Sequence, residues 1–143
     1  MKTTLQQLSI FLENKIGSLI EIMQILSKAD IRIIAATVAD TTEFGILRLI
    51  TTDNAKAGEL LKEANKNSSK SEVIAIACDS SASSFYENVN ILTSGGVVVE
   101  YMYCFSVKGQ AFLILNVNDD AKALELLTAA GVKTISNNDL INL

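Results

Sequence analysis

Apolar and polar positions along the chain form a pattern that occurs twice. Residues 8–29, LSIFLENKIGSLIEIMQILSKA, align with residues 74–95, IAIACDSSASSFYENVNILTSG, at an offset of 66 positions without a gap. The coinciding apolar pairs include Leu8 with Ile74, Ile10 with Ile76, Met23 with Val89, Leu26 with Leu92, and Leu61 with Leu127. One shared offset over this length predicts two copies of one supersecondary unit.

Within each copy, the spacing of apolar residues alternates between every second position, as in a strand, and every third or fourth position, as in a helix. In the first copy the pattern predicts strands at 5–12, 31–39, 45–51 and 67–71, a helix from Ser18 to about Ala29, and a helix at 54–65. In the second copy it predicts strands at 72–78, 97–105, 111–117 and 132–136, a helix from Ser84 to about Gly95, and a helix at 120–130. The order βαββαβ, repeated, predicts an α+β protein whose antiparallel sheet carries its helices on one face.

The repeat predicts two units, at residues 1–71 and 72–143. The polar run 65–72, NKNSSKSE, separates them and must itself carry a strand as well as the connection. A unit of about 70 residues buries little surface alone. We therefore expect two docked units that share a core.

Helix ends are predicted from local signals. Ser18 precedes Glu21 by three residues, and Ser84 precedes Glu87 by three, so both pairs are predicted as capping boxes. Glycines after the helical pattern, at 95–96 and 131, predict left-handed C-terminal caps.

Composition and charge narrow the function classes. The chain has 143 residues, of which 49% are hydrophobic and 20% charged, which is typical of a globular protein. It contains no His, the commonest metal ligand and general base near neutral pH, so a metal site and acid–base catalysis are disfavoured and no cofactor is predicted. A net charge of −4 argues against nucleic acid as a partner. No signal sequence or long apolar run is present, which predicts a soluble cytoplasmic protein with no membrane partner.

Cys78 and Cys104 are predicted as free, buried hydrophobic side chains. They fall on two strands that the predicted sheet separates by a third. Strand spacing then places their Cα atoms about 10 Å apart, which is too far for a disulfide.

Four segments carry a resemblance to a known family. They are 13–19, ENKIGSL; 29–33, ADIRI; 39–48, ADTTEFGILR; and 99–103, VEYMY. Together they resemble the ACT domain, and more specifically the small stand-alone tandem-ACT proteins of bacteria and archaea, over nearly the whole chain. The family's Pro before the loop glycine is Ile16 here, whereas Gly17 is kept. The second loop, 79–85, has neither Pro nor Gly.

The resemblance implies two ferredoxin-like units side by side, forming one eight-stranded antiparallel sheet, with a small ligand bound where the first loop of one unit meets the second strand of its neighbour. The implied ligand is typically a free amino acid. The candidate ligand-binding residues are Glu13, Asn14, Ile16, Gly17, Ser18, Leu19, Val99, Tyr101 and Tyr103. We expect one working site per chain at most, built on Gly17.

The chemistry of these residue types fits an amino acid. Backbone N–H groups of Gly17, Ser18 and Leu19 at a helix start suit a carboxylate, the Asn14 amide can both donate and accept, and Glu13 suits an ammonium group. The alternative for Asn14 is that it is a turn residue only.

The leading hypothesis is therefore a non-enzymatic regulatory protein that senses an amino acid at the interface of two ACT units. The alternative is a structural or regulatory subunit of an amino-acid biosynthetic enzyme without a working ligand site. No nucleophile–base pair can be named, so an enzyme is disfavoured. Strands that are apolar on both sides predict a homodimer through the helix-free face of the sheet.

Overall fold

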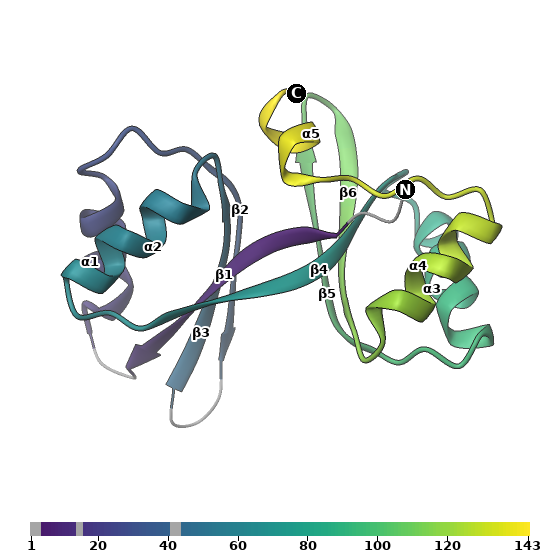
Figure 1. Cartoon of the computed structure of the whole chain (residues 1–143), viewed down its shortest axis with the longest axis horizontal. Coiled ribbons are helices and arrows are strands. Elements are labelled where there is room, and N and C mark those ends of the chain that lie inside the picture. Colours follow the sequence, from purple (N-terminus) through teal and green to yellow (C-terminus); the bar gives the residue numbers. More distant parts are fainter. Residues whose placement is uncertain (1–3, 14–15, 41–43) are drawn as a thin grey trace. The chain divides into compact units, whose positions relative to one another are not determined.

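The computed structural model describes residues 4–13, 16–40 and 44–143. Contacts within the chain divide it into two compact units (Figure 1). We call Gln6–Ser71 the N-terminal unit, and Glu72–Leu143, which Leu5 joins, the C-terminal unit. Strand β4, Ser68–Cys78, carries the chain from one unit into the other. The predicted domain boundary after Ser71 stays a prediction.

The N-terminal unit packs two helices on one face of an antiparallel sheet (Figure 1). Its elements are β1 (Leu5–Glu13), α1 (Ser18–Leu26), β2 (Ile33–Asp40), β3 (Phe44–Thr51), α2 (Asn54–Glu63) and the beginning of β4. Strand β3 lies between β1 and β2, with Leu8 opposite Leu49 and Thr37 opposite Arg48. Side chains alternate between the two faces of a strand, and the buried apolar ones lie on the face that α1 and α2 cover. Its core is formed by Leu8, Ile10, Leu12, Leu47 and Leu49 from the strands and Ile22, Leu26, Ala57 and Leu61 from the helices.

The C-terminal unit repeats this design. Its elements are β4, α3 (Ala82–Ser94), β5 (Val99–Val107), β6 (Gln110–Val117), α4 (Asp120–Ala129) and α5 (Asn137–Ile141). Strand β6 lies between β4 and β5, and the helix side of the sheet includes Ile74, Ile76, Leu113, Leu115 and Val117. Figure 1 shows α5 on the side of β5 and β6 opposite to α3 and α4. The expectation that all helices lie on one face is therefore wrong for α5.

The prediction of eight strands is wrong, because residues 4–13, 16–40 and 44–143 form a six-stranded sheet in the hydrogen-bonded order β2-β3-β1-β4-β6-β5. The strands predicted at 67–71 and 72–78 are a single strand, β4. The polar run holds no Gly or Pro that would end a strand, so the backbone continues through it. The strand predicted at 132–136 is reduced to one bridge between Thr134 and Ile76, because Ser136 already caps α5.

The helix starts differ from the predicted capping boxes at Ser18 and Ser84. Helix α1 begins after Gly17, and Ser18 is its first residue rather than its cap. Helix α3 is capped by Ser81, whose Oγ accepts a hydrogen bond from the Ser84 amide at 3.2 Å. A capping box does occur in the chain, between Ser136 and Asp139 at the start of α5. The S-x-x-E pattern thus gave the correct first residue of α1 but the wrong cap, and it placed the start of α3 two residues too late.

The glycine caps at the helix C-termini are confirmed. Gly96 and Gly131 have positive φ angles, 85° and 76°. After each of them the chain returns a hydrogen bond to the helix, from the Val97 amide to the Leu92 carbonyl at 2.9 Å in α3 and equivalently in α4. Both ends have the geometry of a Schellman motif.

Both cysteines are free, as predicted, but only Cys78 is partly buried. Burial and the neighbouring Cys104 raise the pKa of the Cys78 thiol. Cys104 is exposed, so its prediction as a buried side chain is wrong. It lies on the edge strand β5, where every second residue is exposed. In the described part of the chain, no helix is both long and apolar enough to cross a membrane.

Candidate functional site

The start of α1 lacks the side-chain cap that the other four described helices have. Asp53, Ser81, Asp119 and Ser136 each accept a hydrogen bond from a first-turn amide of their helix. Gly17, at the equivalent position of α1, has no side chain and adopts the left-handed conformation with φ 93°. The first amides of a helix have no partner within the helix. At α1 no side chain of the described residues caps these amides, so an acceptor from outside the helix would fit there.

A cavity of about 150 Å³ lies beside this helix start, within the N-terminal unit. Its lining residues are Phe11, Leu12, Glu13, Ser18, Ile22, Asn65, Lys66 and Asn67. The Oγ of Ser18 is buried and has no hydrogen-bond partner within the described part of the chain. The Lys66 ammonium group lies 3.0 Å from a Glu21 carboxylate oxygen. The cavity thus combines a carboxylate, a hydroxyl and an ammonium group.

The predicted loop residues separate into two groups. Glu13 and Ser18 line the cavity, and Gly17 sets the start of α1. Ile16 is fully exposed and Leu19 is 43% exposed, and neither lines this cavity. Asn14 lies outside the described residues.

A β-bulge separates the predicted strand residues of the C-terminal unit. Val99 lies opposite Val117 and packs against the core beneath α3 and α4. The pairing shifts between Val99 and Tyr101, so Tyr101 and Tyr103 lie opposite Asn116 and Ile114, on the other face. In a regular strand Val99, Tyr101 and Tyr103 would lie on one face. The bulge instead places Val99 on the face opposite to the two tyrosines.

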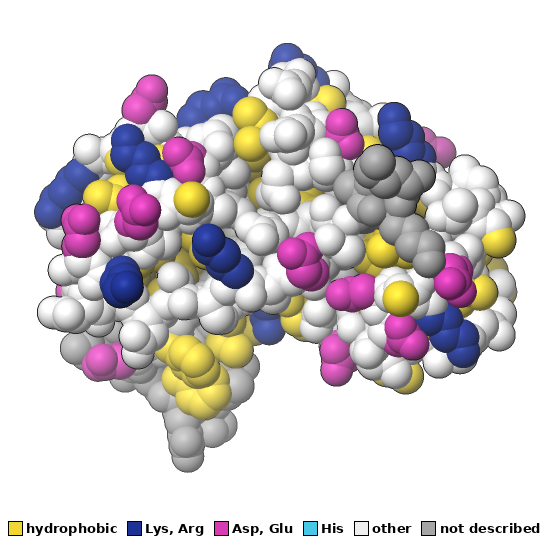
Figure 2. All heavy atoms as spheres, in the orientation of Figure 1, with side chains coloured by type: hydrophobic (Ala, Val, Ile, Leu, Met, Phe, Trp, Pro, Cys, Tyr) yellow, Lys and Arg dark blue, Asp and Glu magenta, His cyan; other side chains and the backbone are white. Residues whose placement is uncertain are grey.

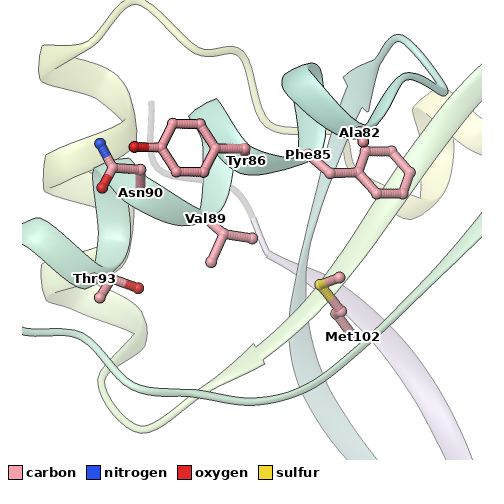
Figure 3. Close-up of a pocket in the computed structure, with 7 residues that line it drawn as sticks. All are labelled: Ala82, Phe85, Tyr86, Val89, Asn90, Thr93 and Met102. Carbon is pink, nitrogen blue, oxygen red and sulfur yellow. The ribbon is translucent and has the colours of Figure 1, made fainter.

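A larger, apolar groove of about 360 Å³ runs between α3 and β5 (Figure 3). Its lining residues are Ala82, Phe85, Tyr86, Val89, Asn90, Thr93 and Met102. Figure 3 shows Val89 of α3 and Met102 of β5 pointing into the space between helix and strand. At the offset of 66, Ala82 and Phe85 correspond to Ile16 and Leu19. In the N-terminal unit, Ile16 and Leu19 therefore occupy the positions that line the groove in the C-terminal unit.

The second loop does not follow the backbone of the first, as its lack of glycine predicted. The cap of α3, Ser81, is extended, with φ −75° and ψ 150°, whereas Gly17 is left-handed. Helix α3 consequently begins at Ala82, two positions earlier in the repeat than α1.

The sequence analysis missed Asn65, Lys66 and Asn67, which the turn after α2 brings to the cavity. Asn65 has a left-handed backbone with φ 60°, and the Lys66 amide donates to the Leu61 carbonyl at 2.8 Å. An Asn after a helical pattern is a recognised signal for such a cap, so the turn could have been found. Among the described residues, no group of three or more Cys, Asp or Glu side chains could hold a metal ion.

Comparisons with known proteins agree with this architecture. The family described as ACT domain pair matches residues 3–143. The crystal structure of protein BT0572 from Bacteroides thetaiotaomicron is 33% identical, with a TM-score of 0.90 over 99% of this chain and 98% of that chain. No curated protein matches the sequence.

Two further solved structures share the fold at low identity. The regulatory subunit of aspartate kinase from Thermus thermophilus is 13% identical, with a TM-score of 0.58 over 90% of this chain and 93% of that chain. Aspartate kinase from Clostridium acetobutylicum is 12% identical, with a TM-score of 0.52 over 87% of this chain and 33% of that chain. The family match and the 33% identical structure establish that this chain belongs to the ACT domain pair family.

Proposed function

We propose that the protein is a non-enzymatic regulatory protein that binds a free amino acid at the start of α1. Membership of the ACT domain pair family supports a regulatory role in which the protein binds a small molecule. The observation that carries the location is the start of α1 at Gly17, where the described residues provide neither a side-chain cap nor a hydrogen-bond partner for the buried Oγ of Ser18. A helix start of this kind attracts anions through its free amides and the positive end of the helix dipole.

The cavity beside α1 complements the two charges of an amino acid. The α-carboxylate would accept hydrogen bonds from the first-turn amides and the Ser18 hydroxyl, with the Lys66 ammonium group as a cation among the described lining residues. The α-ammonium group would face Glu13 at the end of β1. A volume of about 150 Å³ favours a small amino acid, since drug-sized ligands occupy pockets of roughly 300–1,000 Å³.

The response to the ligand would pass to a second protein molecule. Ligand binding shifts an equilibrium only when two states bind the ligand with different affinities. We propose a homodimer or a partner enzyme as the second component. In the N-terminal unit the helix-free face of the sheet carries the exposed Phe11, whose ring lies 5.2 Å from that of Phe44. This aromatic pair would contribute to the dimer.

The test is a thermal-shift screen of the protein against the twenty amino acids. A ligand that binds only the folded state raises the unfolding midpoint by mass action. Ser18→Ala should abolish the shift, because it removes the buried hydroxyl of the cavity. Gly17→Ala should also abolish it, because a left-handed backbone is strained for any residue with a Cβ atom.

Gly109→Ala is the matched control. Gly109 also has a left-handed backbone, with φ 81°, but lies in the turn between β5 and β6. This variant should lose stability and keep the ligand-induced shift. An equal shift in wild-type protein and the Ser18→Ala variant would refute the site, and a screen without any hit would refute amino-acid binding.

The second candidate is a structural or regulatory subunit of a partner enzyme, without a working ligand site. The exposed apolar groove between α3 and β5 favours it, because such surfaces mark protein interaction sites. A precedent with the same fold is the regulatory subunit of aspartate kinase from Thermus thermophilus. Retention of one enzyme on the immobilised protein, lost on Tyr86→Asp and unaffected by amino acids, would favour this function over ligand sensing.

A further inference from the structure

The N-terminal unit contains another cavity, of about 390 Å³, between α2 and the start of β4. Three lysines from consecutive segments line it: Lys62 from the end of α2, Lys66 from the following turn, and Lys70 from β4. The remaining lining residues are Ala55, Gly58, Glu59, Asn67 and Ser68. Among these lining residues, Glu59 is the one acid, so cationic groups dominate the cavity.

The positive charge of the lysine cluster is opposite in sign to the net charge of the chain. The net charge is −4, yet three of the 12 Lys and Arg residues line this one cavity. Figure 2 shows basic and acidic side chains interspersed over α2, so the excess of lysines is a property of this cavity and not of the whole helix surface. Like charges that converge on one cavity repel each other, so their placement favours an anionic occupant.

Lys66 is held in place before any ligand arrives. Its ammonium group lies 3.0 Å from Glu21, and its side chain is only 26% exposed. Its backbone amide is fixed to the Leu61 carbonyl at 2.8 Å. The Glu21 carboxylate therefore competes with an anionic ligand for the Lys66 ammonium group.

Gly58 lines the cavity without a side chain. It lies inside α2, where glycine destabilises a helix relative to alanine. Packing does not require this glycine, because a Cβ atom there would come no closer than 4.0 Å to its nearest neighbour, the Ser68 Oγ. The absent side chain leaves open space between the lysines.

The C-terminal unit lacks this arrangement, so the fold alone does not account for it. At the offset of 66, Thr128, Val132 and Ser136 stand in place of the three lysines. Leu124 stands in place of Gly58 and is 5% exposed. The same helix and the same following segment are thus built there without the cations and without the gap.

We propose that the cavity between α2 and the start of β4 binds a small ligand with two or more negative charges, held by Lys62, Lys66 and Lys70. The Asn67 amide and the Ser68 hydroxyl supply neutral donors at the same cavity. The negative groups are carboxylates or phosphates. This site does not depend on the proposed amino-acid site, with which it shares only Lys66 and Asn67.

Isothermal titration calorimetry with citrate and with pyrophosphate tests the proposal and distinguishes the two chemistries. Sodium chloride at matched ionic strength serves as the reference, because surface charges are screened by salt. The main variant is Lys62→Thr with Lys70→Ser, which installs the residues of the C-terminal unit and leaves Lys66 in place. We expect at least one probe to bind wild-type protein, and this double variant to bind it at least tenfold more weakly.

The control variant is Lys28→Thr with Lys56→Ser, which removes the same charge from the same unit outside the cavity. It should bind the probe as wild-type protein does. Equal weakening of the two double variants would show attraction by net charge only and would overturn the site. Absence of binding by both probes beyond the chloride reference would also overturn it.

Two single variants test the geometry. Gly58→Leu, which introduces the residue found at the equivalent position 124, should fill the cavity and abolish binding while every lysine remains. Glu21→Gln should strengthen binding severalfold, because it frees Lys66 from its ion pair. Unchanged affinity in the Gly58→Leu variant would overturn the cavity as the binding site.

Discussion

At the residue scale, two glycines of this protein are required for different physical reasons. Gly17 is required by a left-handed backbone, whereas Gly95, with φ −89°, is required by close packing. A Cβ atom at Gly95 would lie 2.4 Å from a Leu126 methyl carbon, well inside van der Waals contact. The sequence predicted a glycine cap at 95–96, but Gly96 is the left-handed residue. Only the packing of α3 on α4 explains Gly95.

Gly95→Ala should therefore destabilise the protein by about 1–3 kcal/mol, the usual cost of overpacking. Urea unfolding monitored by circular dichroism measures this change. Gly58→Ala is the matched control, because its Cβ atom has space, and it should stabilise the protein by about 0.5–1 kcal/mol. In a Leu126→Ala background the penalty at Gly95 should shrink, and an unchanged penalty there would contradict the proposed clash.

At the scale of elements, the repeat predicted the approximate positions of β1, β2, β3, β5, β6 and the first four helices, but it divided β4 into two strands and added a strand at 132–136. It did not predict α5, a helix of five residues that is too short to show a helical period. This helix depends on its capping box between Ser136 and Asp139. Hydrogen bonds from the Ser136 backbone and side chain lower the pKa of the Asp139 carboxyl group.

The lowered pKa makes the stability of α5 depend on pH. Since the folded-state pKa of Asp139 lies below its unfolded value, the stabilisation is complete above the unfolded pKa, about 3.9. It is lost as the pH falls through the folded-state value. Asp139→Asn should therefore lower hydrogen-exchange protection of the Leu140 amide at neutral pH, and the difference from wild-type protein should vanish in strong acid.

Ser136→Ala is the companion variant to Asp139→Asn. It removes the hydroxyl that accepts from the Asp139 amide at 3.2 Å, so it should weaken α5 at neutral and at acidic pH. A difference between Asp139→Asn and wild-type protein that persists unchanged in strong acid would contradict the role of the ionised carboxylate.

At the scale of the whole molecule, an ACT domain pair with exposed apolar side chains is expected to associate. We predict a homodimer that uses the helix-free face of the N-terminal unit, where Phe11 is 65% exposed and contacts Phe44. Phe11→Ser with Phe44→Ser should reduce the mass measured by light scattering at micromolar concentration to that of a monomer. Tyr86→Ser, which removes an aromatic ring exposed at the groove beside α3, is the control and should leave the mass unchanged. A monomeric wild-type protein would refute the prediction.

The sequence by itself determined the repeat, and through it the two related units, the strand cores and the glycine-capped ends of α3 and α4. These features depend on neighbours within a few residues, which periodicity and turn chemistry report directly. Only the tertiary structure decided that β4 is one strand, that a bulge parts Val99 from Tyr101, and that lysines 62, 66 and 70 line one cavity. Those outcomes depend on pairing and packing between segments far apart in the chain, and no local pattern specifies them.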